Sequence, residues 1–173
     1  MSVKRRLPEW FKVKSPGSEN FLSLKSKISG ASLNTVCEEA ACPNIGDCWD
    51  RGTATFMILG DTCTRACSYC NVKTGWPNTI DRSEPFRVAT TVKKMNLKYT
   101  VITSVDRDDL EDYGSGIFAE TIISVRNLSP NCKIEVLIPD FEGDFGALKK
   151  VIDAKPQVLN HNIETVRRVF RKV

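Results

Sequence analysis

Six of the seven cysteines in this chain of 173 residues fall into two groups of three, and their spacing limits the fold more than any other feature. The first cysteine group reads Cys-x4-Cys-x5-Cys and the second cysteine group reads Cys-x3-Cys-x2-Cys. The members are Cys37, Cys42 and Cys48 in the first group, and Cys63, Cys67 and Cys70 in the second. Each group offers three thiolates and no fourth ligand at a comparable spacing. Thiolates this close in sequence indicate a metal centre that keeps one coordination position open.

Zinc and iron–sulfur clusters are the two kinds of centre that such cysteines could hold. Structural zinc usually takes four ligands, commonly in Cys-x2-Cys pairs. Neither group has an obvious fourth partner, because Cys132 is distant in sequence and His161 is the only histidine. A four-iron cluster held by three thiolates leaves one iron free for another ligand. The spacing therefore favours an iron–sulfur cluster over zinc at each group.

The rest of the composition fits an ordinary globular protein of a reducing compartment. No apolar run approaches the roughly 20 residues that span a bilayer, and the basic N-terminus lacks the apolar core of a signal peptide. We therefore expect a cytoplasmic location, no membrane partner, and cysteines that bind metal rather than form disulfides. The net charge of +4 is spread along the chain without an aromatic-interleaved basic stripe, so we expect no nucleic-acid partner.

The apolar pattern divides the chain into two regions, 1–52 and 53–173. The first carries little regular pattern and several Pro and Gly residues, which predicts an extension ordered mainly by its ligands and by packing on the main domain. The second alternates between β-prone runs at 53–60, 99–105, 133–139 and 158–163 and helical stripes. The predicted buried stripes are Val88, Ala89, Val92 and Met95; Phe118, Thr121, Ile122, Val125 and Leu128; Phe145, Leu148, Val151 and Ile152; and Val166, Val169, Phe170 and Val173.

This alternation of strands and helices predicts an α/β fold with a parallel sheet. A complete eight-unit barrel uses about 250 residues, or roughly 31 for each unit. Residues 53–173 hold about four units at that rate. The last strand of an open sheet of this kind would expose a pairing edge. We therefore expect a partial (β/α) barrel, the N-terminal part of a larger one, preceded by the cysteine-bearing extension.

The second cysteine group lies directly after the first predicted strand of this βα domain. Cys-x3-Cys-x2-Cys in that place resembles the radical S-adenosylmethionine superfamily, and longer strings resemble the lipoyl synthase family within it. These strings are 7–13, 33–49, 60–67, 101–110, 138–141 and 160–165. The resemblance covers nearly the whole chain, and it implies that the partial barrel is a radical S-adenosylmethionine barrel with a cluster-binding extension.

The resemblance implies a particular reaction. A lipoyl synthase is a sulfurtransferase of lipoate biosynthesis that inserts two sulfur atoms into an octanoyl chain attached to a lysine of a carrier protein. By this resemblance, the second cysteine group holds a [4Fe–4S] cluster that binds S-adenosylmethionine and cleaves it to a 5′-deoxyadenosyl radical. Its three cysteines are therefore the catalytic candidates. The first cysteine group would hold an auxiliary [4Fe–4S] cluster that is consumed as the sulfur source.

The resemblance also implies partners, namely octanoylated lipoyl-carrier domains such as E2 subunits and the glycine cleavage H protein, and an electron donor such as flavodoxin or ferredoxin. In this family a serine of an Arg-Ser-Ser-Tyr motif supplies the fourth ligand of the auxiliary cluster, and the barrel has six βα units. This sequence contains no such motif. It predicts either a part of a longer protein or a short form that does not complete the reaction. The alternative functions are a radical S-adenosylmethionine enzyme of other specificity and a non-catalytic module that binds a cluster or zinc.

Further polar residues are candidates for binding the cofactor, several because they follow predicted strands at the end of a barrel that faces its site. They are Tyr69, Thr103, Ser104, Asp106, Arg107, Glu135, Asn160 and His161. Tyr69 stands where the superfamily often has an aromatic residue near the adenine, and packing over the cluster explains it equally. The alternative for His161 is a structural role as a buried residue that is hydrogen-bonded to a neighbouring loop. The alternative for Glu135 is an ion pair with Arg or Lys. For Thr103, Ser104, Asp106 and Arg107, the alternative is that the segment caps a helix and forms a solvent-exposed salt bridge.

Overall fold

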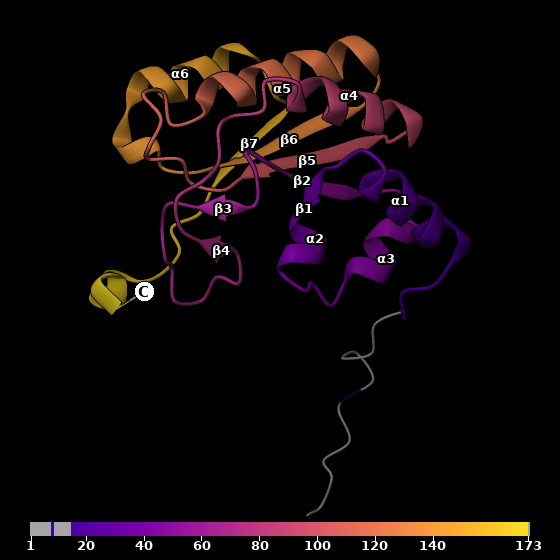
Figure 1. Ribbon diagram of the computed structural model, residues 1–173, viewed down its shortest axis with the longest axis horizontal. Helices are drawn as coiled ribbons and strands as arrows, with labels where there is room; N and C mark the ends of the chain where they lie inside the picture. The colour runs from indigo at the N-terminus through magenta and orange to yellow at the C-terminus, as the bar shows by residue number, and fades with distance from the viewer. Residues whose placement is uncertain (1–7, 9–14, 173) are drawn as a thin grey trace, which may run out of the picture.

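The computed structural model describes Pro8 and residues 15–172; the string 7–13, apart from Pro8, and Val173 of the last predicted stripe lie outside these residues. Its centre is a five-stranded sheet in the order β1-β2-β5-β6-β7 (Figure 1). The parallel strands are β2 (Ala54–Ile58), β5 (Tyr99–Ser104), β6 (Lys133–Ile138) and β7 (Val158–His161). β1 (Asn34–Thr35) pairs with β2 in the antiparallel sense. The parallel strands coincide with the runs predicted from the sequence.

Three helices connect the parallel strands, and all of them cover the same face of the sheet (Figure 1). They are α4 (Glu84–Lys94), α5 (Ser115–Leu128) and α6 (Phe145–Asp153). A barrel is wound in this way, with strands adjacent in chain order and every crossover helix on the outer face. A doubly wound sheet has helices on both faces instead. The fold is therefore a mixed α/β sheet consistent with part of a (β/α) barrel.

The core lies between the sheet and these helices. Alternate side chains of β5 and β6 are buried toward the helices, and Ile102 and Val136 are fully buried. Phe118 of α5 is also fully buried, and its ring meets the ring of Phe141 edge-on with the centroids 6.2 Å apart. Phe141 opens the 3₁₀ turn Phe141–Gly143 after β6. The core therefore fixes the carboxyl ends of the strands in place. The polar loops begin at these ends.

Phe118→Ala is expected to lower the free energy of unfolding by about 3–5 kcal/mol, because it removes a fully buried ring. Ile123→Ala on the same helix is the matched control, since Ile123 is 47% exposed. Its cost is expected to stay below about 1 kcal/mol. Urea unfolding followed by circular dichroism measures both variants, and equal losses would contradict this account of the core.

The N-terminal region is more regular than the sequence predicts. It forms α1 (Glu19–Ser29), β1, α2 (Val36–Glu39) and α3 (Ile45–Asp50). Ser18 begins α1 by accepting the N–H of Phe21 on its side-chain oxygen. The ring of Phe21 stacks on that of Trp49 with centroids 5.1 Å apart, and Trp49 is fully buried. Because β1 pairs with β2, this small helical unit is docked on the main sheet.

The last βα unit leaves apolar side chains exposed. Every residue of β7 is exposed. In the stripe predicted to be buried on α6, Val151 is buried, whereas Phe145 and Ile152 are 73% and 49% exposed. The expectation for these two residues is wrong because α5 covers only the side of the predicted stripe that carries Val151, together with Ala147. The last predicted helix is a 3₁₀ helix, Arg167–Lys172, without a buried residue.

Within the described part of the chain, no helix has both the length and the apolar character needed to cross a membrane.

Candidate metal centres and the adjoining cavity

The second cysteine group occupies the loop that follows β2. The chain leaves β2 through Leu59 and Gly60, which both have left-handed backbone conformations, with φ of 70° and 97°. A residue other than glycine adopts this conformation at a cost of roughly 1–2 kcal/mol. The loop then forms β3 (Thr62–Cys63), which pairs with β4 (Lys73–Thr74). The N–H of Gly75 donates to the carbonyl oxygen of Cys63 at 3.0 Å, so the two ends of the cysteine loop are held together.

Backbone N–H groups point at two sulfur atoms of this loop. Cys63 Sγ accepts the N–H of Arg65 at 3.4 Å and that of Asp106 at 3.3 Å. Cys70 Sγ accepts the N–H of Val72 at 3.5 Å. Burial raises the pKa of the Cys63 thiol, and the two N–H groups oppose this by favouring the thiolate. Hydrogen bonds to sulfur are one of the means by which proteins set the reduction potential of an iron–sulfur cluster.

The first cysteine group lies on the short N-terminal helices. Cys37 is buried in α2, Cys48 lies on α3, and Cys42 lies between them with its N–H donating to the Cys37 carbonyl oxygen at 3.1 Å. Burial raises the pKa of the Cys48 thiol, and the nearby thiols of Cys37 and Cys42 raise it further. Thr35 caps α2 by accepting the N–H of Glu38. The thiols of Cys37 and Cys42 are therefore close enough to Cys48 to affect its pKa.

The donor chemistry of both groups fits iron–sulfur clusters. Each group supplies three soft sulfur ligands, and all of these thiols are free of disulfides. Among the residues that the structure describes, no three Cys, His, Asp or Glu side chains converge as they would around a single metal ion.

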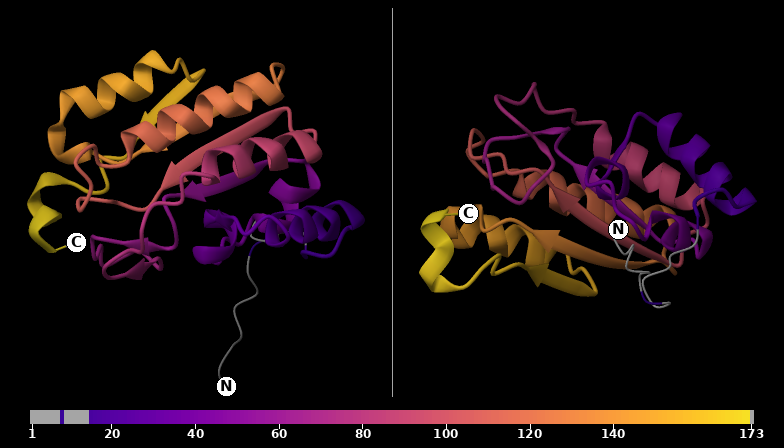
Figure 2. Two further views of the ribbon diagram at one scale, coloured as in Figure 1. Left: turned by 45° about the horizontal axis from the view of Figure 1, so that its top comes forward. Right: turned by 90° about the horizontal axis from the view of Figure 1, so that it is seen from below.

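A hydrogen bond joins the two cysteine segments. Asn71 follows Cys70 directly, and its side-chain amide donates to the carbonyl oxygen of Glu39 at 2.9 Å. Glu39 lies between Cys37 and Cys42 in the first group. Figure 2 shows the cysteine loop with the N-terminal helices on one side of it and the C-terminal turn on the other. The two candidate metal centres are therefore neighbours in space.

A cavity of about 390 Å³ adjoins the second cysteine group. Its walls come from the cysteine loop and from the loops after β5, β6 and β7, at the strand ends where βα barrels bind their ligands. The lining residues are Arg65, Cys67, Tyr69, Asp106, Ile138, Pro139, Asp140, His161, Asn162, Ile163, Glu164 and Phe170. The volume is within the range of roughly 300–1,000 Å³ for small-molecule sites.

Three residues predicted to bind the cofactor line this cavity, namely Tyr69, Asp106 and His161. The Tyr69 hydroxyl donates to Glu164 at 2.7 Å, and this bond raises the pKa of the phenol. The Nδ1 atom of His161 lies 3.0 Å from the carbonyl oxygen of Ile138. The alternative account, a buried histidine bonded to a neighbouring loop, is wrong, because His161 is exposed and its partner Ile138 is the last residue of the paired strand β6.

Thr103, Ser104 and Arg107 were also predicted to bind the cofactor, but they do not line the cavity. The Thr103 hydroxyl donates to the carbonyl oxygen of Leu137 at 2.9 Å. The Ser104 hydroxyl is buried and has no hydrogen-bond partner among the described residues. Arg107 is only 3% exposed and directs its guanidinium to both carboxylate oxygens of Asp109 at 2.8 Å. These interactions turn Arg107 into the protein rather than toward the cavity.

Glu135 and Asn160 also lie apart from the cavity, on the face of the sheet that the helices leave open. The Glu135 carboxylate accepts the Asn160 side-chain amide at 2.5 Å and the Tyr99 hydroxyl. The partners of this carboxylate within the sheet are therefore a tyrosine and an asparagine, and not the Arg or Lys that the alternative expected.

Sequence reasoning missed Arg65, which ties the cysteine loop to two strand ends. Its Nε and Nη2 atoms donate to the two carboxylate oxygens of Asp108 at 2.9 and 2.8 Å, and Nη2 also donates to Asp140 at 2.7 Å. These bonds lower the pKa of both carboxyl groups, whereas burial raises that of Asp106. The sequence contained one sign of this role, namely an arginine between two cysteines of the second group and acidic residues after two predicted strands.

Two protein-family models match this chain. The model of the radical SAM superfamily matches residues 57–173, and the model of the N-terminal domain of lipoyl synthase of the radical SAM family matches residues 1–42.

Curated relatives with the name lipoyl synthase match almost all of the chain. The protein of Chloroflexus aggregans is 54% identical over 167 residues, which are 96% of this chain and 55% of the relative. That of Roseiflexus sp. is 53% identical over 171 residues, 99% of this chain and 57% of the relative. The mitochondrial lipoyl synthase of Nematostella vectensis is 51% identical over 166 residues, 96% of this chain and 57% of the relative. The chain thus spans about half the length of the curated relatives it matches.

Proposed function

Because the chain belongs to the radical S-adenosylmethionine superfamily, whose members use a [4Fe–4S] cluster and S-adenosylmethionine, we propose that it takes part in the lipoyl synthase reaction. In that reaction two sulfur atoms are inserted into a protein-bound octanoyl-lysine. The observation that carries the proposal is the arrangement of the two cysteine groups. They are neighbours through the bond between Asn71 and Glu39, and the second group adjoins a cavity at the strand ends.

Cys63, Cys67 and Cys70 hold the cluster that binds S-adenosylmethionine. The N–H···S bonds at two of these sulfur atoms support this role, because they stabilise the negative charge of a metal-bound thiolate. S-adenosylmethionine occupies the cavity beside Cys67, where the Tyr69 ring and the carboxylate of Asp106 form part of the wall.

Cys37, Cys42 and Cys48 hold the auxiliary cluster. Bound to the two groups, iron–sulfur clusters would supply one electron for each S-adenosylmethionine that is cleaved and sulfur atoms for the octanoyl chain. The Asn71 bond and the pairing of β1 with β2 hold the two cysteine segments beside each other. A short separation matters because the substrate carbon must meet both the radical and the sulfur.

The octanoyl chain would arrive on a lipoyl-carrier domain, such as an E2 subunit or the glycine cleavage H protein, and the electron from a flavodoxin or ferredoxin. Free thiols in both groups suit a reducing compartment such as the cytoplasm.

Product analysis tests this proposal directly. Anaerobically reconstituted and reduced protein, given S-adenosylmethionine and an octanoyl-lysyl peptide, is expected to form 5′-deoxyadenosine and the lipoyl-lysyl peptide, both measured by mass spectrometry. Deoxyadenosine without the lipoyl peptide would favour a radical enzyme of other specificity. Stoichiometric zinc without iron would favour a non-catalytic module and contradict the proposal.

Arg65→Lys is expected to slow deoxyadenosine formation about tenfold and Arg65→Ala about a hundredfold. Lysine keeps the charge but lacks the planar fork that makes the bidentate pair with Asp108, whereas alanine leaves the carboxylates of Asp108 and Asp140 without this cation. Initial rates at saturating S-adenosylmethionine measure the effect. Arg82→Ala is the control, since Arg82 is exposed and makes none of these bonds. Wild-type rates in both Arg65 variants would show that the loop does not depend on this ion pair.

A further inference from the structure

The turn between β2 and the cysteine loop is held by groups that the proposed function does not use. Leu59 and Gly60 follow the last residue of β2 and both have positive φ. Leu59 is almost completely buried, at 3% exposed. A left-handed conformation at a non-glycine residue persists only where its surroundings determine it. Cys63 lies only three residues beyond Gly60, so the direction of this turn sets where the first thiol of the loop is placed.

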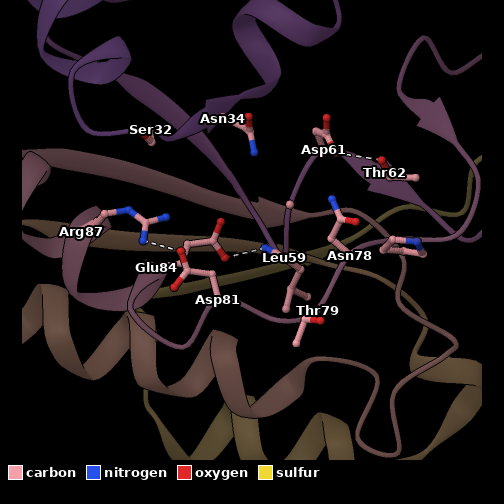
Figure 3. A pocket seen from close by; sticks show the side chains of 12 residues that line it. Ser32, Asn34, Leu59, Asp61, Thr62, Asn78, Thr79, Asp81, Glu84 and Arg87 are labelled. Atoms are coloured by element: carbon pink, nitrogen blue, oxygen red, sulfur yellow. Dashed lines mark hydrogen bonds and ion pairs between the residues drawn. The ribbon is translucent and has the colours of Figure 1, made fainter.

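The carboxylate of Glu84 holds the N–H side of the turn. Glu84 is the first residue of α4 and is 5% exposed. Its Oε2 atom accepts the N–H of Leu59 at 2.7 Å, and the N–H of Gly60 also faces the carboxylate. Figure 3 shows Glu84 reaching Leu59 at the wall of a cavity of about 160 Å³. Successive N–H groups in such a turn form a concave site for an anion, and here the anion is a side chain of the same protein.

The guanidinium of Arg107 holds the carbonyl side of the same turn. Its Nη1 atom donates to the carbonyl oxygen of Leu59 at 3.2 Å, and its Nη2 atom donates to that of Asn78 at 3.2 Å. The bidentate pair with Asp109 fixes the plane of the guanidinium. Leu59 is therefore bound through its N–H by an acid on α4 and through its C=O by a base after β5.

The side chain of Leu59 is confined as well. Gly114, with φ of 81°, lies against it, and a Cβ atom at this position would be 2.3 Å from Leu59 Cδ1. The backbone and the side chain of Leu59 are thus fixed by three different parts of the chain.

We propose that Glu84 and Arg107 are positioning residues that hold the Leu59–Gly60 turn and thereby place Cys63 for metal binding. This inference rests on the proposed function, since it concerns the metal centre of the second cysteine group. It assigns Arg107 to the support of the ligand loop, in place of contact with the nucleotide or carboxylate of S-adenosylmethionine.

Binding of S-adenosylmethionine to the reduced, reconstituted protein tests the inference without relying on turnover. Glu84→Gln keeps the size of the side chain but removes the negative charge that accepts the Leu59 N–H, and Arg107→Lys keeps the charge but removes the planar fork that binds the carbonyl oxygens and Asp109. The change in the electron paramagnetic resonance spectrum on adding S-adenosylmethionine is expected to need about ten times more of it in each variant than in the wild type. Glu120→Gln and Arg82→Lys are the matched surface controls and are expected to titrate as the wild type does. Identical titrations in wild type and both test variants would overturn the inference.

The reactivity of Cys63 in the metal-free protein separates this inference from the proposed function. Cys63 is half-buried and Cys70 is exposed. The ratio of their alkylation rates by iodoacetamide, followed by peptide mass spectrometry, is expected to rise about tenfold in Glu84→Gln and in Arg107→Lys, the size of effect typical of a group that supports a ligand. An unchanged ratio in both variants would contradict the inference even if the wild type binds S-adenosylmethionine. If the wild-type spectrum does not respond to S-adenosylmethionine, the proposed function fails and this ratio still decides the positioning role.

Discussion

Cys67→Ala is expected to abolish the formation of 5′-deoxyadenosine from S-adenosylmethionine by the reduced protein. Under the proposal, Cys67 is one of three thiolates on the cluster of the second group, and two thiolates do not hold that cluster. Loss of a group that only supports a ligand costs about 10–100-fold, so loss of a ligand itself should exceed a hundredfold. Cys67 also lines the 390 Å³ cavity, which places the missing thiol where S-adenosylmethionine would bind. Chromatography of the nucleoside product and iron analysis measure the two consequences.

Cys132→Ala is the matched control for this experiment. Cys132 is buried and lies outside both groups, and among the described residues its thiol makes only a weak hydrogen bond, to the carbonyl oxygen of Lys133. Its replacement should leave both the iron content and the rate of deoxyadenosine formation at the wild-type level. A Cys67→Ala protein that still forms deoxyadenosine at a comparable rate would exclude the second cysteine group as the site of the reaction.

Cys37→Ala is expected to separate the two parts of the reaction. Cys37 is the buried member of the first group, and its loss should remove about four iron atoms per chain, those of one cubane cluster. Deoxyadenosine should still form because the second cysteine group is unchanged, but the lipoyl-lysyl peptide should not, since its sulfur donor is missing. Mass spectrometry of the peptide and of the nucleoside gives both answers from one incubation. A Cys37→Ala protein that forms the lipoyl product would contradict the assignment of the first group as the sulfur source.

The parallel sheet could be predicted from the sequence because its strands are short β-prone runs that alternate with amphipathic helices. The N-terminal helices were missed because few apolar residues mark them, although those of α1 stand at the i, i+3 and i+7 positions of one helix face. On α1, only Phe21, Leu24 and Ile28 are buried among mostly polar residues. Their burial depends on Trp49, which is distant in sequence and meets Phe21 only after folding. On α6, the sequence showed an apolar stripe but could not show which half of it α5 would cover.

The candidate site was predictable in its cysteines and less so in the residues around them. Cysteine spacing is a local property, so both groups could be recognised before any fold was considered. The carboxylates that Arg65 meets are distant in sequence, whereas Arg107 pairs with Asp109 two residues away and reaches the distant carbonyl oxygens of Leu59 and Asn78. Arg107 was expected to face the cofactor, but its guanidinium binds Asp109 and Leu59 in the interior. Arg65 was overlooked, although it is the residue that connects the cysteine loop with two strand ends.

The most direct test of the account is the iron content of the anaerobically reconstituted chain together with its electron paramagnetic resonance spectrum, recorded before and after S-adenosylmethionine is added. About eight iron atoms per chain are expected, from two four-iron clusters. S-adenosylmethionine is expected to change the signal of one cluster, the one held by Cys63, Cys67 and Cys70, and to leave the other unchanged. Uptake of zinc without iron would contradict the assignment of the two cysteine groups to iron–sulfur clusters. So would two clusters whose signals both stay unchanged when S-adenosylmethionine is added.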